Sequence, residues 1–224
     1  MDLSESRRRA SELSGGTSSE PIRALVARCL AQEQARGSVL DFGAGRGELL
    51  GELHRTSLFE SLAGIDLFAR PETLPPSIAW FQHDLNEPLR LDRGFDAVVC
   101  SETIEHLENP RHVFRTLYGL VRPGGTLVLT MPNQESIRSY AGLIVAGHFT
   151  QFLGDCYPAH ITALVRLDLA RMCGEVGFAP PRFDYTDVGA MPKLTRVTWQ
   201  RASFGLLRGR LFSDNVAMIT RRAR

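Results

Sequence analysis

The sequence has 224 residues, 43% of them hydrophobic and 23% charged, and its 26 basic and 25 acidic side chains leave a net charge of +1. This composition excludes a disordered, collagenous or fibrous protein, and the length favours one domain around a single core. The small total charge gives no general reason to expect a polyanionic or membrane partner. It results from a cancellation, however, because residues 193–224 hold eight basic side chains and one acidic one.

The N-terminal residues 1–19 are polar and rich in serine and glycine, which predicts a flexible tail with a short helix near residues 7–13. No apolar stretch follows the three arginines of this segment, so no secretory signal is expected. The four cysteines form no CxxC pair, and no apolar run reaches the length of a membrane span. We therefore expect a reduced, cytoplasmic protein.

Residues 20–224 predict one folded domain of alternating strands and helices. Helical spacing of apolar residues indicates helices over 20–34, 48–54, 111–120 and 164–175. Short apolar runs predict strands over 38–42, 61–67, 78–84, 95–101, 126–131, 182–188 and 216–221. This order indicates an α/β fold with a doubly wound, mostly parallel sheet. The last two strands are expected to be antiparallel, because only a loop-like insert separates them.

The segment after the first predicted strand has the character of a ligand-binding turn. Ligands of doubly wound sheets bind beyond the carboxyl ends of the strands. The chain reads Asp41-Phe42-Gly43-Ala44-Gly45-Arg46-Gly47 at this point. Alternate glycines permit a tight turn and a close approach of the backbone to a ligand. The spacing differs from that of a dinucleotide-binding fingerprint, and the acidic Asp41 suits a ligand that carries an ammonium group better than a pyrophosphate.

Acidic residues also follow the second and third predicted strands. Asp66 and Leu67 end the second strand, where a carboxylate can accept both hydroxyls of a ribose. Asp84 and Leu85 lie at the end of the third strand and just after it. The carboxylate can accept a hydrogen bond from the amino group of an adenine there, and the apolar neighbour can flank the ring.

The chain resembles the class I S-adenosylmethionine-dependent methyltransferases through five segments in the order LDFGAGRG, GIDL, HDL, FDAVVCSETIEHL and RPGG. The resemblance is close over residues 20–130 and looser beyond them. Within this family, the chain resembles the group that includes the ubiquinone-pathway O-methyltransferases. The resemblance implies a single domain with a seven-stranded sheet in the order 3-2-1-4-5-7-6, the last strand antiparallel, and S-adenosylmethionine as the cofactor.

The resemblance also assigns site residues by position. The residues at the methionine part of the cofactor would be Asp41, Gly43, Ala44 and Gly45. The residues at the nucleoside would be Asp66, Leu67, Asp84 and Leu85. Ser101, after the fourth strand, would lie on the methionine side near the sulfonium. Each of these assignments follows from the family's pattern and is carried over as an expectation.

A cluster after the fourth strand, Glu102, Glu105 and His106, has the spacing of neighbours on one helical turn. Three interpretations stay open. In the first, which resembles the ubiquinone-pathway enzymes and needs no metal, His106 acts as the general base with Glu102 beside it. In the second, the cluster and His160 resemble the metal ligands of small-RNA 3′-terminal 2′-O-methyltransferases. In the third, the turn only packs above the sheet.

Two inserts are expected to decide the acceptor and the partners. Residues 133–160 carry aromatic and apolar side chains that suit a lid over a carbon-rich acceptor, or a short helix packed on the rim of the sheet. Residues 190–213 mix apolar and basic side chains, which favours either an interfacial helix or a solvated helix that caps the pocket. A peripheral membrane or protein contact is therefore expected within residues 190–224.

The sequence thus predicts an S-adenosylmethionine-dependent methyltransferase that acts on an oxygen of a small-molecule or lipid-like acceptor. The alternative reaction is metal-assisted 2′-O-methylation of RNA 3′ ends, and the alternative of another class is a non-catalytic cofactor-binding scaffold. A nucleic-acid partner is not expected, because the strands that bear the pocket lie in the mildly acidic part of the chain. The identity of the acceptor and the oligomeric state do not follow from the sequence.

Overall fold

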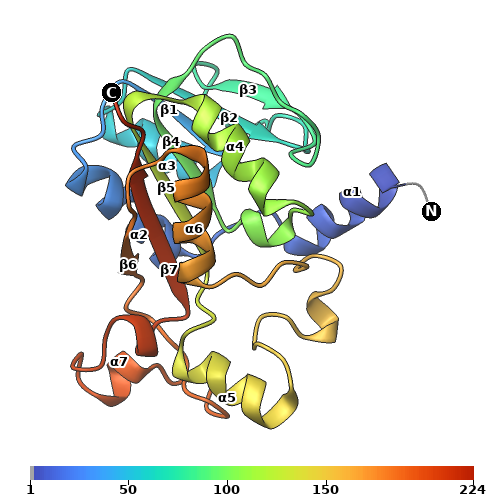
Figure 1. The fold of residues 1–224 in the computed structure, drawn as a ribbon, viewed down its shortest axis with the longest axis vertical. Coiled ribbons are helices and arrows are strands. Elements are labelled where there is room, and N and C mark those ends of the chain that lie inside the picture. The colour runs from blue at the N-terminus through green and yellow to red at the C-terminus, as the bar shows by residue number, and fades with distance from the viewer. Residues whose placement is uncertain (1–2) are drawn as a thin grey trace.

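Strand pairing in the computed structural model, which describes residues 3–224, gives a seven-stranded sheet in the order β3-β2-β1-β4-β5-β7-β6. Strands β1 to β5 pair in parallel, whereas β7 is antiparallel to both β5 and β6. Helices cover both faces of the sheet (Figure 1). The predicted α/β class, the strand order and the antiparallel last strand are confirmed.

The strands lie close to the predicted ranges. Strands β1 (Ser38–Phe42) and β4 (Phe95–Ser101) have the predicted bounds. Strand β5 (Val121–Pro132) begins earlier than predicted, because Val121 already pairs with Phe95 before the register shifts. The other strands are β2 (Ser61–Asp66), β3 (Ala79–Gln82), β6 (Arg182–Tyr185) and β7 (Asn215–Arg221).

Two apolar layers hold the sheet between its helices, because successive residues of a strand point to opposite faces. On one face Leu40 and Val98 belong to a core that includes residues of α4 (Pro110–Leu120) and α6 (Arg166–Val176). On the other face Val39 and Val99 belong to a core with α2 (Glu20–Gln32) and α3 (Glu48–Thr56). The two layers fix the carboxyl ends of β1 to β4 along one edge.

Three helices lie outside this sandwich. Helix α1 (Leu3–Ser14) is longer than the short helix predicted for the N-terminal segment, whose mobility stays a prediction. Helix α5 (Ile137–Ala146) occupies the first insert, and α7 (Trp199–Ala202) occupies the second together with a short 3-10 turn, η3 (Arg210–Phe212). Figure 1 shows α5 and α7 at the same end of the molecule.

The helix expected in the second insert is present only as the four residues of α7, and most of residues 190–213 is irregular. The chain turns at Gly205 and Gly209, where φ is 83° and 76°, and these left-handed conformations interrupt any helix. In residues 3–224 we find no helix that combines the length and the hydropathy needed to cross a bilayer.

Candidate functional site

A cavity of about 390 Å³ opens at the carboxyl ends of β1 to β4. Residues predicted for the cofactor and residues predicted for the chemistry all line this one cavity. The first group is Asp41, Gly43, Ala44, Gly45, Asp66, Leu67, Asp84, Leu85 and Ser101, and the second is Glu102, Glu105, His106 and His160. The site residues predicted from the sequence therefore lie together in the folded chain.

The glycine turn after β1 forms a surface that only glycine permits. Gly43 and Gly45 have φ of 87° and 52°, which is left-handed backbone. A Cβ at Gly43 would collide with the Thr103 side chain, and a Cβ at Gly45 would collide with the backbone of Gly16. The Gly43 N–H donates to the carbonyl oxygen of Ile65 at 2.9 Å, which ties the turn to β2. Glycine is therefore required at both positions because other segments of the chain pack directly against the turn, which also lines the cavity.

Asp41 is a buried carboxylate with an unmet hydrogen-bonding capacity. Its Oδ1 atom is buried and has no hydrogen-bond partner among the described residues. Burial, aided by the nearby charge of Asp66, raises the pKa of Asp41 to about 7. A cationic group beside this oxygen would satisfy it and restore its charge. The ammonium of S-adenosylmethionine is such a group, so Asp41 fits this cofactor.

Asp66 at the end of β2 is held by the glycine turn. Its Oδ2 accepts from the backbone N–H of Gly45 at 2.8 Å, and its Oδ1 accepts from that of Phe68 at 3.0 Å. Burial raises the pKa of Asp66, and these two donors oppose the rise. Each oxygen keeps a further lone pair for a ligand hydroxyl. The geometry therefore suits recognition of a ribose.

Helix α1 closes the end of the cavity that contains Asp84, a feature that the sequence did not reveal. Arg7 donates to Asp84 at 3.0 Å, to Glu87 at 2.6 Å and to both carboxylate oxygens of Glu108 at 2.9 Å. These bonds, that with Glu108 foremost, raise the pKa of the Arg7 guanidinium. The sequence signal was slight, because a basic residue in a polar segment is usually solvated. The position of Arg7 at the cavity is fixed by three acidic residues that are distant from it in the sequence.

The acceptor end of the cavity begins where β4 ends. Glu102 has φ of 49°, an uncommon left-handed conformation for a residue other than glycine. Its Oε2 accepts from the Asn215 amide at 2.8 Å, while its Oε1 is buried without a partner among the described residues. The Ser101 hydroxyl lies 2.9 Å from that of Thr130 on β5. The strained turn therefore directs a carboxylate into the cavity.

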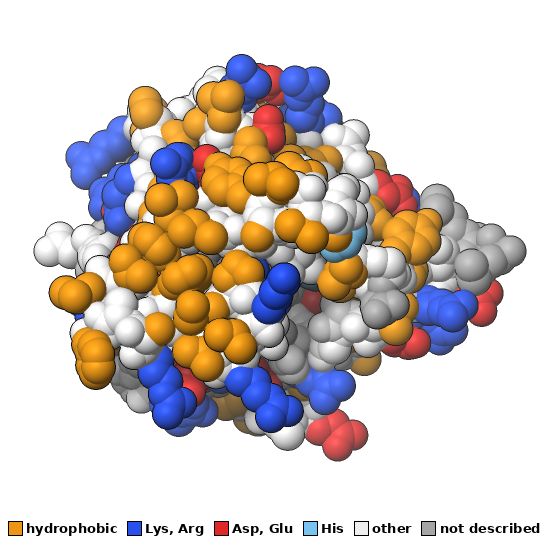
Figure 2. All heavy atoms as spheres, turned by 90° about the horizontal axis from the view of Figure 1, so that it is seen from below, with side chains coloured by type: hydrophobic (Ala, Val, Ile, Leu, Met, Phe, Trp, Pro, Cys, Tyr) orange, Lys and Arg blue, Asp and Glu red, His pale blue; other side chains and the backbone are white. Residues whose placement is uncertain are grey.

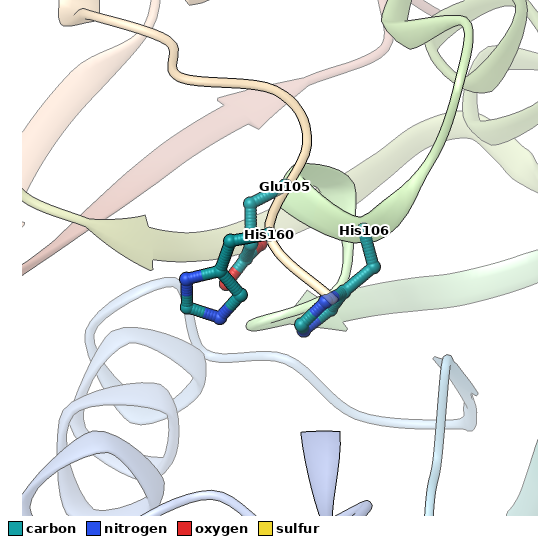
Figure 3. Close-up of side chains that lie close together, drawn as sticks. All are labelled: Glu105, His106 and His160. Carbon is teal, nitrogen blue, oxygen red and sulfur yellow. The ribbon is translucent and has the colours of Figure 1, made fainter. Parts of the chain in front are cut away.

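Glu105, His106 and His160 converge at this end, as Figure 3 shows. Their ligand-type atoms all lie within 4.8 Å of one another, and Glu105 and His106 belong to the 3-10 turn η1 (Ile104–His106). Glu102, the fourth residue of the predicted metal set, lies outside this group and accepts from Asn215 instead. His160 comes from the first insert, so the chain brings it to the cavity from 54 residues further along the sequence.

Both imidazole rings are oriented by backbone carbonyls. The Nδ1 of His106 lies 2.8 Å from the Ala159 carbonyl oxygen, and that of His160 lies 2.6 Å from the Gln151 carbonyl oxygen. A carbonyl oxygen only accepts, so each Nδ1 carries the proton and each neutral ring keeps its lone pair on Nε2. The rings can therefore accept a proton or bind a cation through Nε2.

Burial makes the charged forms of this cluster costly. It raises the pKa of the Glu105 carboxyl well above its usual value, and the neighbouring charge of Glu102 raises it further. Burial also raises the pKa of Glu102, and it lowers the pKa of His106. Both oxygens of Glu105 are buried without partners among the described residues. The cluster is therefore incomplete until a donor or a cation enters the cavity.

Comparison with known proteins finds similarity to methyltransferases. A family model described as a methyltransferase domain matches residues 15–180. An uncharacterized methyltransferase of Mycobacterium bovis is 34% identical over 105 residues, 45% of this chain and 53% of that protein. The ubiquinone biosynthesis O-methyltransferase of Xanthomonas campestris pv. campestris is 32% identical over 143 residues, 59% of this chain and 58% of that protein. The chain spans about half the length of the curated relatives it matches.

The fold also resembles solved structures over almost the whole chain. The plantazolicin methyltransferase BpumL, in complex with a pentazolic desmethylPZN analog and SAH, matches with a TM-score of 0.65. The match covers 99% of this chain and 95% of that one, at 14% sequence identity. At this identity the likeness concerns the fold.

Proposed function

This chain belongs to the S-adenosylmethionine-dependent methyltransferases, and we propose that it methylates an oxygen of a small-molecule or lipid-like acceptor. S-adenosylmethionine, the cofactor of the family, supplies an electrophilic methyl group on a sulfonium. The donor is already activated, so the protein has to align the acceptor and remove its proton. Relatives named as ubiquinone biosynthesis O-methyltransferases support oxygen as the target.

Contacts at the carboxyl ends of β1 to β3 support a cofactor half of the site. We assign the cofactor ammonium to Asp41, whose Oδ1 has no protein partner, and the ribose to Asp66. Asp84 and Leu85 are assigned to the adenine. Ser101, on β4 between the two halves, is assigned to the methionine side. The turn through Gly43, Ala44 and Gly45 lines the same cavity and is assigned to the methionine part.

The orientation of His106 carries the proposal. Because Nδ1 donates to the Ala159 carbonyl, Nε2 faces its surroundings with a free lone pair. The lowered pKa keeps the ring neutral near pH 7, which is the form that accepts a proton. His106 would take the proton of the acceptor hydroxyl as the methyl group is transferred, and Glu102 would orient that hydroxyl.

Isotope labelling tests the proposal directly. Purified protein is incubated with cell extract and S-adenosylmethionine labelled in its methyl group, and the products are analysed by mass spectrometry. We expect a small labelled product whose methyl group is bonded to oxygen. A labelled product methylated on nitrogen or carbon, or cofactor binding without any labelled product, would contradict the proposal. The latter result would favour a non-catalytic scaffold.

A second candidate, metal-assisted 2′-O-methylation of RNA 3′ ends, is favoured by one observation. Glu105, His106 and His160 present unpartnered ligand atoms, and each imidazole donates its other N–H to a carbonyl, as metal-binding histidines do. A divalent cation held there would supply Lewis-acid polarisation of the acceptor oxygen.

Chelation and a defined substrate separate the two candidates. The second candidate predicts methylation of an RNA oligonucleotide at its terminal 2′-hydroxyl, loss of this activity in chelator, and its return with Mg²⁺ or Mn²⁺. Activity on a small acceptor that survives chelation would reject it. If the second candidate is right, His160→Asn should abolish activity as chelation does, because it removes one metal ligand. If the first candidate is right, the variant should stay active, because His106, the proposed base, is still present.

A further inference from the structure

The two inserts of the domain are tied into one surface. Asn133, which begins the first insert, donates its side-chain amide to the carbonyl oxygens of Arg210 at 2.6 Å and Ser213 at 2.8 Å. Asp214 accepts from the guanidinium of Arg138 on α5 at 3.2 Å. These bonds join α5 to the end of the second insert. We call this surface the insert face, and it comprises residues 137–154 and 188–212.

The insert face exposes large apolar side chains. Phe204 is 97% exposed, Leu206 is 85% exposed, and Ile144 and Val145 on α5 are 84% and 81% exposed. Further exposed apolar residues of the face are Leu143, Leu153, Val188, Leu194 and Leu211. Figure 2, which views this end of the molecule, shows a broad hydrophobic patch with basic side chains at its edge. Such a patch marks an interaction site.

Hydrogen bonds hold the loop that carries Phe204. The Gln200 side chain accepts from the Gly189 N–H at 3.0 Å and donates to the carbonyl oxygens of Leu207 at 2.9 Å and Phe212 at 2.8 Å. Phe204 itself has φ of 53°, a conformation that is unfavourable for a bulky side chain. The loop is therefore braced from within, yet it presents an aromatic ring that packs against almost nothing in the chain.

The charge of the insert face has one sign. Residues 188–213 contain five basic side chains and no acidic one, and residues 137–154 contain Arg138 and no acidic one. Arg138 pairs with Asp214, and Arg210 lies 3.6 Å from Glu135. Four basic residues of the face form no ion pair within the part of the chain that the structure describes, namely Lys193, Arg196, Arg201 and Arg208.

We propose that the insert face binds an anionic lipid surface. Its exposed apolar side chains suit the boundary between headgroups and acyl chains, and its unpaired basic side chains suit anionic headgroups. A second copy of the chain is a poor occupant, because it would bring the same positive charge against this face. An anionic membrane satisfies both properties of the surface.

The cavity opens beside the insert face. Tyr157 and Ile161 line the cavity and are themselves exposed, and Leu153 just before them belongs to the face. The segment between α5 and Tyr157 is held to α5 by the Thr150 hydroxyl, which donates to the Arg138 carbonyl oxygen at 3.1 Å. Docking therefore brings the acceptor end of the cavity near the membrane. We therefore also infer, on the basis of the proposed function, that the methyl acceptor is a hydroxyl compound carried by a lipid.

Vesicle flotation tests the membrane proposal without cofactor or acceptor. The full chain is mixed with vesicles of phosphatidylcholine alone, or with vesicles in which about one third of the lipid is phosphatidylglycerol. We expect strong binding to the anionic vesicles, weak binding to the neutral ones, and a decrease as salt is raised. Since no turnover is measured, a failure of the proposed reaction leaves this result unaffected.

Two variants separate the apolar and the charged contributions. Phe204→Asn should lower binding to anionic vesicles about tenfold, since it removes an exposed aromatic anchor. Asparagine tolerates left-handed backbone, so the thermal melting temperature should not fall. Replacing Arg201 and Arg208 by glutamine should lower binding about 25-fold, or about fivefold for each charge. Leu58→Asn is the matched control, because Leu58 is an exposed apolar residue just before β2 and lies outside the insert face.

Three results would overturn the proposal. The first is equal binding to neutral and anionic vesicles. The second is unchanged binding of Phe204→Asn in a protein that melts like the wild type. The third is a stable dimer in sedimentation equilibrium that Phe204→Asn dissociates, because the insert face would then be covered by a second copy. Cofactor affinity, measured by calorimetry, should be the same for Phe204→Asn and the wild type.

Discussion

The two halves of the cavity differ in how far the protein satisfies its own polar groups. In the cofactor half, both carboxylate oxygens of Asp66 accept backbone N–H groups, and Asp84 is bound by Arg7. In the acceptor half, both carboxylate oxygens of Glu105 and one of Glu102 are buried without partners among the described residues. Burying an unsatisfied carboxyl costs free energy. The fold therefore satisfies the carboxylates of the first half except at Oδ1 of Asp41, and it leaves three carboxylate oxygens of the second half to a ligand.

This difference implies different roles for the two halves. Contacts in the cofactor half are made before the ligand arrives, so their removal should weaken cofactor binding. Groups in the acceptor half are held ready but unpaired, so their removal should slow the reaction and leave cofactor binding nearly unchanged. Asp41 lies in the cofactor half but carries an unpartnered oxygen, so it should couple cofactor binding to protonation.

The largest effect is expected in the acceptor half. His106→Ala should lower turnover by about a hundredfold to ten-thousandfold, because it removes the proposed general base. Cofactor affinity, measured by calorimetry, should change by less than about threefold. His54→Ala is the control, since His54 is exposed on α3 away from the cavity. An unaltered rate in His106→Ala would favour the interpretation in which this turn only packs above the sheet.

Asp66→Ala should lower cofactor affinity by about a hundredfold, because two hydrogen bonds from the ribose to a carboxylate are lost. Gly45→Arg should weaken binding at least as much, since its side chain would fill the turn and displace the backbone of Gly16. Calorimetric titration measures both. Asp92→Ala, an exposed acidic residue, serves as the control. Wild-type affinity in both variants would refute the assignment of the cofactor half.

Cofactor affinity should fall about tenfold between about pH 8 and about pH 6. In the cofactor-free protein the pKa of Asp41 is about 7, so at lower pH a proton must leave before the ammonium can bind. The same raised pKa means that the native state binds this proton more tightly than the unfolded chain. The contribution of Asp41 to the free energy of unfolding should therefore fall as pH rises toward 7. In Asp41→Asn, a flat pH profile is expected, and a profile like that of the wild type would contradict the assignment.

The smallest effect is expected at α1. Arg7→Ala should speed cofactor release roughly threefold, because partly exposed ion pairs contribute little free energy each. Stopped-flow measurement of the dissociation rate gives this value. Arg8→Ala is the neighbouring control, since Arg8 is mostly exposed and lies 4.0 Å from Glu12. Equal rates in the two variants would show that the contacts of Arg7 do not retain the cofactor.

The fold and the cofactor half were predictable because their signals are local. Strands β1 and β4 have the predicted bounds, since each is a short, mostly apolar run that is buried along nearly all of its length, as is usual for central parallel strands. Asp41, Gly43 and Gly45 also lie in one short segment, so this segment alone predicted a ligand-binding turn. The second insert is mostly irregular and holds only the short helix α7, because Gly205 and Gly209 adopt left-handed backbone, a feature that its mixture of apolar and basic side chains did not reveal.

The acceptor half was predictable only in part, because it is assembled from distant segments. Glu102, Glu105 and His106 share one motif, whereas His160 joins them through the connection that contains Gln151. Helical spacing predicted that Glu102 and Glu105 face one site, and both line the cavity. Glu102 lies outside the group of converging ligand atoms, however, and accepts from Asn215 on β7. Arg7 could not be found from the sequence, because its three acidic partners lie at least 77 positions away. Such contacts exist only once the chain is folded.

The most direct test of the division between the two halves compares Asp66→Ala with His106→Ala at very high cofactor concentration. Formation of the labelled product is followed by mass spectrometry with the acceptor that the extract experiment identifies. Saturating cofactor should restore most of the product in Asp66→Ala, because that variant lacks only binding contacts. It should restore none in His106→Ala, because that variant lacks the proposed base. Recovery of His106→Ala, together with no recovery of Asp66→Ala, would contradict the account.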